Sequence, residues 1–246
     1  MKKLFENIPV FLCVLLLSGM PDLITAQPET GEKLVSMMYE RYHTSWFRQV
    51  SFTQTANFYS NDTLVKSETW YEAYRFPGML LIKFNDLKGG DGMLFRNDSV
   101  YSFKNGEIST AGKRIHDLIL LSLDIYLQDP ETSLAKIREQ GYDPGKLSMG
   151  KYRGKDIYIV GDSLTNCFWI DAENLLFLKM HKKTEKGLEE VLFDGYIRSG
   201  GGWIEQEVYF YLDGKLRMDE KYENISTGFN AGEDWFLPGN FSRASW

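Results

Sequence analysis

Apolar and polar residues follow two different periods along this chain, and the period changes several times. Between Glu29 and Ser45 apolar residues recur at steps of three and four, which predicts an amphipathic helix. From Val50 to Tyr59 the period becomes two, with Phe52 on the apolar face, which predicts a half-buried strand. The pattern therefore predicts a helix followed by a sheet.

The period of two continues from Leu64 to Arg75, which predicts a second long strand antiparallel to the first. Lys66, Glu68 and Glu72 fall on its polar face. Tyr71 falls among the residues of the other, apolar face.

Nine further alternating runs bring the expected number of strands to about eleven, separated by turns that contain Gly, Asn and Asp. No linker-like tract divides them, so we expect one curved antiparallel sheet in a single domain, residues 27–246. The later runs are Leu80 to Phe84, the surroundings of Leu94, Val100 to Phe103, Ile157 to Val160, Cys167 to Ile170, Leu175 to Lys182, Leu188 to Ile197, Trp203 to Leu212 and Lys215 to Asn224.

The segment from Ile115 to Leu127 interrupts the strands. It is apolar on nearly every face of a helix, including Leu118, Leu121 and Ile125, and a helix of this kind must be covered from both sides. A second, amphipathic helix is expected from Pro130 to Gln140, with proline in an allowed first-turn position. We expect the first helix to lie against the concave side of the sheet.

The first 26 residues have the pattern of a secretory signal peptide, with cleavage expected after Ala26. Lys2 and Lys3 precede an apolar stretch from Pro9 to Leu17. An uncleaved anchor helix is the alternative, but this stretch is much shorter than the roughly 20 residues that span a bilayer. Cys13 lies inside the stretch, so no lipid-attachment motif is present. We therefore expect an exported, periplasmic protein.

Composition and charge narrow the choice of partners. The net charge of −6 argues against nucleic acids and anionic membrane surfaces, because both require a basic surface. Cleavage would leave Cys167 as the sole cysteine, and its neighbours Phe168 and Trp169 indicate a packed thiol rather than a nucleophile.

The sequence contains none of the common enzyme motifs. There is no Gly-x-Ser-x-Gly elbow, phosphate loop or dinucleotide fingerprint. His43, His116 and His181 fall on three different elements, where we expect surface or edge positions and no metal. Glu205 and Glu207 are expected on a solvated strand face, although a sheet can also carry the two carboxylates of a glycosidase. We expect no enzymatic activity, no cofactor and no metal.

Five short motifs follow one another along the chain: Ser51 to Gln54, Arg75 to Gly78, Asn97 to Tyr101, Phe168 to Leu178 and Trp235 to Pro238. In this order they resemble the LolA-like family of periplasmic lipoprotein carriers, over nearly the whole mature chain. The resemblance implies a mainly β fold, an incomplete antiparallel barrel with helices as a lid over an apolar cavity. It implies lipoprotein or lipid acyl chains as ligands, an inner-membrane release complex and an outer-membrane acceptor as partners, and we expect a monomer.

The family pattern differs from this sequence next to the proline turn. In the family an arginine directly before the proline helps to latch the lid, whereas here Phe76 has that place and Arg75 lies one residue earlier. One residue reverses the face in a strand. Either a bulge restores Arg75 as the lid latch, or the lid is held in another way.

The candidate ligand-binding residues lie on the apolar strand faces and on the lid helix. For each of them the alternative is that it fills a β core. For the whole protein, the alternative to a carrier is a lipid-binding sensor or a structural envelope module with the same fold. The candidates are Phe52, Phe58, Tyr71, Leu80, Ile82, Phe84, Phe103, Leu118, Leu121, Ile125, Leu178, Phe193, Val208 and Phe210.

Overall fold

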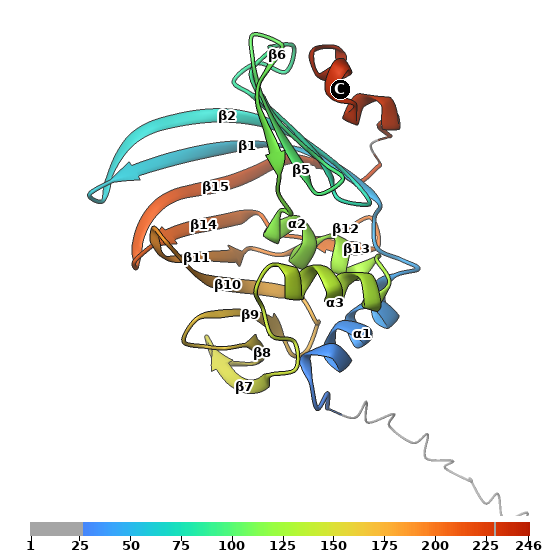
Figure 1. Ribbon diagram of the computed structural model, residues 1–246, viewed down its shortest axis with the longest axis vertical. Coiled ribbons are helices and arrows are strands. Elements are labelled where there is room, and N and C mark those ends of the chain that lie inside the picture. The colour runs from blue at the N-terminus through green and yellow to red at the C-terminus, as the bar shows by residue number, and fades with distance from the viewer. Residues whose placement is uncertain (1–26, 229) are drawn as a thin grey trace, which may run out of the picture.

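The computed structural model describes residues 27–228 and 230–246, and a large curved antiparallel sheet dominates it (Figure 1). The expected signal peptide, residues 1–26, lies outside the described residues. The large sheet has 13 strands in the order β6-β5-β4-β3-β2-β1-β15-β14-β11-β10-β9-β8-β7, and β12 and β13 form a separate pair. Because β6 and β7 are edges, the sheet is open rather than closed into a barrel.

Two runs of hairpins, β1 to β6 and β7 to β11, make up most of the sheet, and β14 and β15 connect them. β15 pairs with β1 in a register that places Tyr222 opposite Gln54. The strands of the large sheet are β1 (Gln49–Ser60), β2 (Thr63–Arg75), β3 (Met79–Phe84), β4 (Gly92–Arg96), β5 (Ser99–Lys104), β6 (Glu107–Lys113), β7 (Leu147–Tyr152), β8 (Lys155–Gly161), β9 (Asn166–Asp171), β10 (Phe177–Thr184), β11 (Gly187–Asp194), β14 (Glu207–Leu212) and β15 (Lys215–Ser226); the short pair is β12 (Ile197–Ser199) and β13 (Gly202–Ile204).

The prediction of a curved antiparallel sheet is confirmed, but the strands differ in detail. Both edge strands were missed because they lack an apolar alternation: every residue of β6 is exposed, and no residue of β7 is buried. The expected strand from Leu188 to Ile197 ends at Asp194. Gly195 then adopts a φ of +66°, and the chain continues into the short pair.

Two of the helices agree closely with the sequence pattern. α1 (Gly31–Tyr42) begins after Thr30, whose hydroxyl accepts a hydrogen bond from the Lys33 backbone N–H at 3.2 Å. α3 (Pro130–Glu139) begins after Asp129, whose carboxylate accepts from the Thr132 N–H at 2.9 Å.

The prediction of one continuous helix from Ile115 to Leu127 is wrong. The segment forms the short helix α2 (Asp117–Ser122) and, after Leu123, the 3₁₀ turn η1 (Asp124–Tyr126). Asp124 is 2 % exposed and is hydrogen-bonded to the sheet. A buried carboxylate requires such partners, and Asp124 has them at the position where α2 has ended and the 3₁₀ turn begins.

The helices and the C-terminal segment cover opposite faces of the sheet (Figure 1). On the helix side the main core combines α1, the α2 region and apolar side chains such as Tyr74 and Ile82. On the other side the 3₁₀ turns η2 (Glu233–Phe236) and η3 (Pro238–Arg243) cover a smaller core, where the rings of Phe103 and Phe241 stack with centroids 3.8 Å apart. The sheet therefore separates two independent apolar clusters.

Candidate ligand-binding cavity

A cavity of about 200 Å³ remains between the helix-side face of the sheet and α2. Its walls come from β1 to β4 on one side, from β11, β14 and β15 on the other, and from α2 with the residues on either side of it. Because these strands are far apart in the sequence, only the completed sheet encloses the cavity. Side chains of the main core fill much of the rest of this face, and Phe193 also borders a second hollow of about 380 Å³.

Six of the sequence-predicted residues line this cavity, from both halves of the sheet and from α2. They are Phe52, Leu80, Ile82, Leu118, Phe193 and Phe210. Three other candidates, Leu121, Ile125 and Val208, belong to the main core but do not contribute to the cavity wall. Leu121 and Ile125 are fully buried, and they attach the lid to the protein rather than present a surface to a ligand.

Phe58 and Phe84 both lie beside Trp70, which does line the cavity. The ring centroids of Phe84 and Trp70 are 4.8 Å apart, and those of Phe58 and Trp70 are 5.9 Å apart. The two phenylalanines therefore support a wall residue and do not form the wall themselves.

Three candidates lie elsewhere. The sequence pattern assigned the faces of β2 in reverse: Trp70, Glu72 and Tyr74 line the cavity, so the neighbouring odd-numbered residue Tyr71 is directed to the other face. Phe103 belongs to the smaller core on that face. Leu178 lines a separate hollow of about 380 Å³ that also contains charged side chains.

The lid, which we define as residues 117–139 from α2 to α3, is held to the sheet by Asp124. Its carboxylate accepts hydrogen bonds from the Tyr74 hydroxyl at 2.6 Å and from the Gly78 N–H at 3.1 Å. Burial raises the pKa of Asp124 to about 6. The lid therefore has a latch, in which the latch residue belongs to the lid and its partners are Tyr74 of β2 and Gly78 of the turn between β2 and β3.

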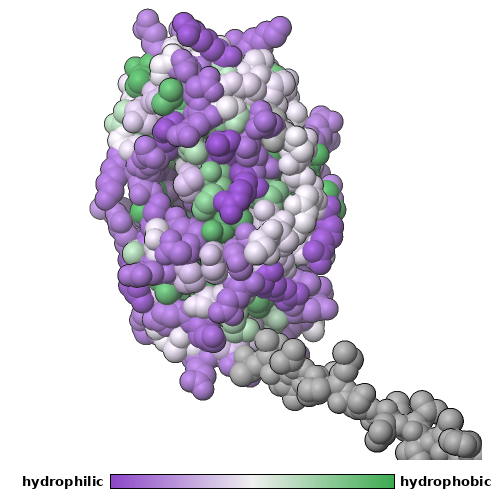
Figure 2. Space-filling model, turned by 90° about the vertical axis from the view of Figure 1, so that its right-hand side faces the viewer, coloured by the Kyte–Doolittle hydropathy of each residue, from purple (hydrophilic) through white to green (hydrophobic). Residues whose placement is uncertain are grey.

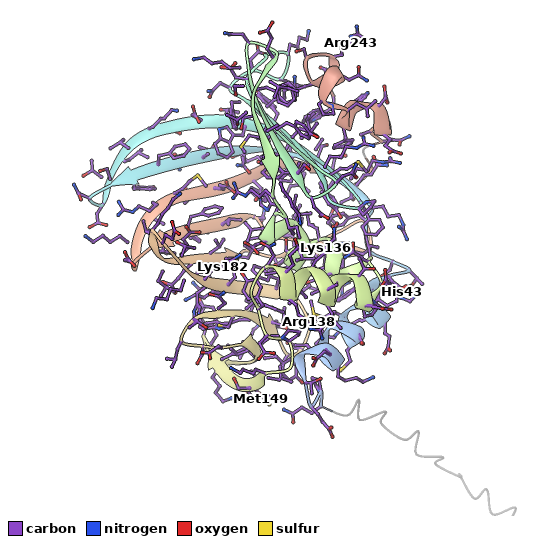
Figure 3. All side chains as sticks on the ribbon, viewed as in Figure 1. His43, Lys136, Arg138, Met149, Lys182 and Arg243 are labelled. Atoms are coloured by element: carbon purple, nitrogen blue, oxygen red, sulfur yellow. The ribbon has the colours of Figure 1, made fainter. Side chains whose placement is uncertain are left out.

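Four ion pairs add to this attachment: Lys113 with Glu139 at 2.7 Å, Arg138 with Glu32 at 3.3 Å, and the two less exposed pairs of Lys136 and Lys182 (Figure 3). Lys136 of α3 lies 2.7 Å from the Asp98 carboxylate, and Lys182 of β10 lies 3.2 Å from the Asp117 carboxylate at the start of α2. The four side chains of these two pairs are partly exposed, so each of the two pairs contributes on the order of 1 kcal/mol or less.

Arg75 does not contact the lid. Its guanidinium donates a hydrogen bond to the Ala231 carbonyl at 2.9 Å, in the segment that covers the other face of the sheet. β2 runs without a bulge at this point, since Arg75 pairs regularly with Gln49 and Met79. The shift of one residue relative to the family pattern therefore does reverse the face on which the arginine lies. Arg75 is on the face that the C-terminal segment covers, and the lid is on the other face.

Four buried polar residues of the site were missed by sequence reasoning. Glu72 and Glu220 line the cavity, and Gln54 and Glu205 are buried next to them, with 1 % and 6 % exposure. Burial and the neighbouring carboxyls raise the pKa of Glu72; burial raises that of Glu220 and brings that of Glu205 to about 8. The sequence did contain a sign of this burial: the large aromatic residues Trp70 and Tyr74, two residues before and after Glu72, share its face of β2, which indicates that this face is covered.

The expectation for His116 is also corrected. His116 is not a surface residue, because it lines the cavity, caps α2 and meets the Phe95 ring edge-on at 4.6 Å. Burial lowers its pKa to about 3, so the imidazole is neutral. The other wall residues that the candidate set lacked are Trp70, Tyr74, Met93, Phe95, Arg114, Ile119, Ser122, Leu123, Met218 and Tyr222.

Cys167 has a histidine neighbour that the sequence did not reveal. The distance from Cys167 Sγ to His181 Nε2 is 3.4 Å. Burial raises the pKa of the thiol to about 11 and also lowers the pKa of His181. The thiol therefore stays protonated at neutral pH, as a packed side chain does.

Three further features bear on what the protein can bind: the polarity of its surface, its helices and the grouping of its potential metal ligands. The face in Figure 2 is mostly hydrophilic, with apolar side chains in a small area near its centre. Among residues 27–228 and 230–246, no helix is long and apolar enough to cross a membrane. The same residues contain no cluster of His, Cys, Asp or Glu side chains arranged to hold a metal ion.

Comparison with solved structures identifies the fold. The chain is similar to a LolA superfamily protein from Nitrosomonas europaea, with a TM-score of 0.55, 12% identity, and coverage of 82% of this chain and 97% of that one. It is also similar to a domain named for outer membrane lipoprotein sorting, from Vibrio parahaemolyticus, with a TM-score of 0.60, 13% identity and coverage of 87% and 98%.

A third similar structure is a DUF1329 family protein from Desulfovibrio piger, with a TM-score of 0.59, 13% identity, and coverage of 84% of this chain and 95% of that one. No protein-family model and no curated protein matches the sequence. At these identities the comparisons establish the fold alone. This chain has the LolA-like fold, as its five motifs predicted.

Proposed function

We propose that this protein is a periplasmic carrier that binds the acyl chains of lipoproteins or of another lipid in the cavity under α2. It would take its cargo from an inner-membrane release complex, deliver it toward an outer-membrane acceptor, act as a monomer and catalyse no reaction. The observation that carries the proposal is the apolar cavity between the lid and the sheet, in a fold shared with a LolA superfamily protein and with a domain named for outer membrane lipoprotein sorting.

The size of the cavity supports a carrier whose lid moves. Ligand pockets commonly measure about 300–1,000 Å³, so a cavity of about 200 Å³ accepts a short stretch of one acyl chain in this closed arrangement. Each methylene that enters is worth about 0.8 kcal/mol. A long chain requires displacement of α2, which has only six residues.

The attachment of the lid fits reversible opening. Its polar contacts are the two hydrogen bonds of Asp124, the buried hydrogen bond from the Phe177 N–H to the Tyr126 hydroxyl at 2.9 Å, and partly exposed ion pairs such as those of Lys136 and Lys182. Opening exchanges these contacts for water and exposes the cavity wall. A carrier needs this balance because a cargo that binds must also be released.

The test is a titration with long-chain acyl ligands, using displacement of the neutral apolar dye N-phenyl-1-naphthylamine and calorimetry. Leu118→Asp is the informative variant, because Leu118 is half-buried on α2 and lines the cavity. Leu164→Asp is the matched control, since Leu164 is 85 % exposed in the turn between β8 and β9.

We expect the wild type and Leu164→Asp to bind acyl chains reversibly, and Leu118→Asp to bind at least about tenfold more weakly, because the new charge lies where the chain would be. Absence of acyl-chain binding in the folded wild type would overturn the proposal. The sensor or structural alternative would then replace it.

A further inference from the structure

The polar residues at the cavity lie on three adjacent strands, β2, β1 and β15. In the register of the sheet, Gln54 of β1 pairs with Trp70 on one side and Tyr222 on the other. Glu72 lies two residues from Trp70 on β2, and Glu220 lies two residues from Tyr222 on β15. Side chains two apart in a strand share a face, so Glu72 and Glu220 flank Gln54 diagonally on the cavity side.

The two carboxyl groups have no cationic partner. None of the ion pairs among the described residues includes Glu72, Glu205 or Glu220. The Tyr222 hydroxyl donates to Glu220 at 3.1 Å. Arg114 is the only Lys or Arg among the described residues of the cavity wall. It precedes α2 and is exposed to solvent.

The buried amide of Gln54 is a second, independent observation that points to a polar group of a ligand. Its side chain is 1 % exposed, and neither its amide nitrogen nor its amide oxygen makes a hydrogen bond of normal geometry in the described residues. The amide lies close enough to Glu220 to favour the charged form of that carboxyl. An unpaired buried amide costs about 1–3 kcal/mol, so a group that bonds to it gains affinity.

We propose that Gln54, Glu72 and Glu220 form a subsite for the protonated primary amine of an amphiphilic ligand whose alkyl or acyl chain occupies the apolar part of the cavity. This inference rests on the proposed carrier function and specifies the polar end of its cargo.

An ammonium group fits the subsite in charge and in hydrogen bonding. It carries three N–H donors, and Glu72 and Glu220, which line the cavity, offer their carboxyl groups as acceptors, while the Gln54 amide is buried between them behind the wall. Because burial raises the pKa of both carboxyl groups, an ammonium would bind with release of a proton from them, and its hydrogen bonds to the resulting carboxylates are stronger than neutral ones. The chain of the ligand would contact Phe52, Leu80 and Phe210, which line the same cavity.

The experiment compares ligands with the same alkyl chain and different head groups. Dodecylamine, dodecanol and dodecanoate are titrated against N-phenyl-1-naphthylamine bound to the full mature chain, below the concentrations at which the ligands aggregate. The variants are Glu72→Gln and Glu220→Gln. Glu223→Gln is the matched control, because Glu223 lies on the same strand as Glu220 and is exposed.

We expect dodecylamine to displace the dye at a concentration at least about tenfold lower than dodecanol, with dodecanoate the weakest of the three. Each cavity variant should reduce the advantage of the amine to below about threefold and leave dodecanol unchanged, while Glu223→Gln keeps the advantage. The wild-type comparison alone decides the question if a cavity variant does not fold.

The possible failures are distinguishable. Equal displacement by all three ligands, or an amine advantage that survives both cavity variants, would overturn the amine subsite and leave the carrier proposal intact. Failure of the folded wild type to bind the dye and every ligand would overturn both.

Discussion

The buried carboxyl groups predict an unusual dependence of stability on pH. Burial raises the pKa of Glu205 from 4.5 to about 8 in the folded protein. At neutral pH the folded chain therefore holds a proton that the unfolded chain has released. The free energy of unfolding must then fall as the pH rises from the unfolded pKa toward the folded one.

In the window between pH 6.5 and pH 8 this effect is larger than those of Asp124, Lys83, His116 and His181. His116 and His181, whose pKa values burial lowers, have the opposite influence, but each has released at least half of its unfolded-state proton by pH 6.5 and adds less than about 1 kcal/mol within the window. The contribution of Asp124, whose folded pKa is about 6, is nearly complete at pH 6.5. Lys83, whose pKa burial lowers to about 8, is half deprotonated in the folded protein at pH 8 and opposes the loss by less than about 1 kcal/mol within the window. Across the window Glu205 passes from almost full to half protonation, which lowers the free energy of unfolding by about 1–2 kcal/mol.

The assay is urea denaturation followed by circular dichroism at the two ends of this window. The wild type should lose about 1–2 kcal/mol from Glu205 and more from Glu72 and Glu220, whose pKa values are also raised. Glu205→Gln keeps the shape without the titration, so its loss should be smaller by about 1–2 kcal/mol. The exposed control Glu223→Gln should behave like the wild type. A wild-type stability that is level or rises across the window would refute the argument, as would a Glu205→Gln variant with the full loss.

Three further predictions concern the lid and the two faces of the sheet. Leu121→Ala should lower the free energy of unfolding by about 2–5 kcal/mol in urea denaturation, because Leu121 is fully buried; an unchanged midpoint would contradict its burial. Asp124→Ala removes the acceptor of the Tyr74 hydroxyl, so hydrogen exchange of the lid amides should accelerate while exchange in β8 and β9 does not; uniform exchange would contradict the latch. Phe241→Ala should cost about 3–5 kcal/mol of stability yet leave acyl-chain affinity unchanged, because Phe241 stacks on Phe103 in the core of the other face; weaker binding would contradict that separation.

The general fold could be predicted from the sequence because the apolar period follows burial. β1 lies inside the sheet, between β2 and β15, and one of its faces is buried, so apolar and polar residues alternate clearly along it. The edge strands β6 and β7 have too few buried positions to produce the same signal. The five ordered motifs added the family resemblance, which the comparison of structures confirms for the fold.

The candidate site was predictable only in part, because a cavity wall is a property of the assembled sheet. Phe52 and Phe210 were found, since both are apolar residues on clearly alternating strands. Glu72 was assigned to a solvated face because it is charged, although the face is decided by Trp70 and Tyr74 beside it. Periodicity reports which residues share a face, but it does not report which face is covered when a carboxyl is buried there.

The latch shows the same limit for long-range contacts. Asp124 lies 50 residues from Tyr74 in the sequence, and the hydrogen bond between them appears in no local pattern. Arg75 was considered because it is near the family position, yet its contact with Ala231 spans 156 residues. Local sequence reasoning located the lid, and only the packed structure shows what holds it.

The most direct test of the carrier proposal is native mass spectrometry of the mature protein purified from a periplasm, followed by mass spectrometry of the extracted lipid. The proposal predicts a fraction of the wild type with a bound acyl-bearing molecule, which Leu164→Asp retains and Leu118→Asp loses. Only the bare polypeptide mass in the wild type, both as purified and after incubation with acyl-chain ligands, would contradict it.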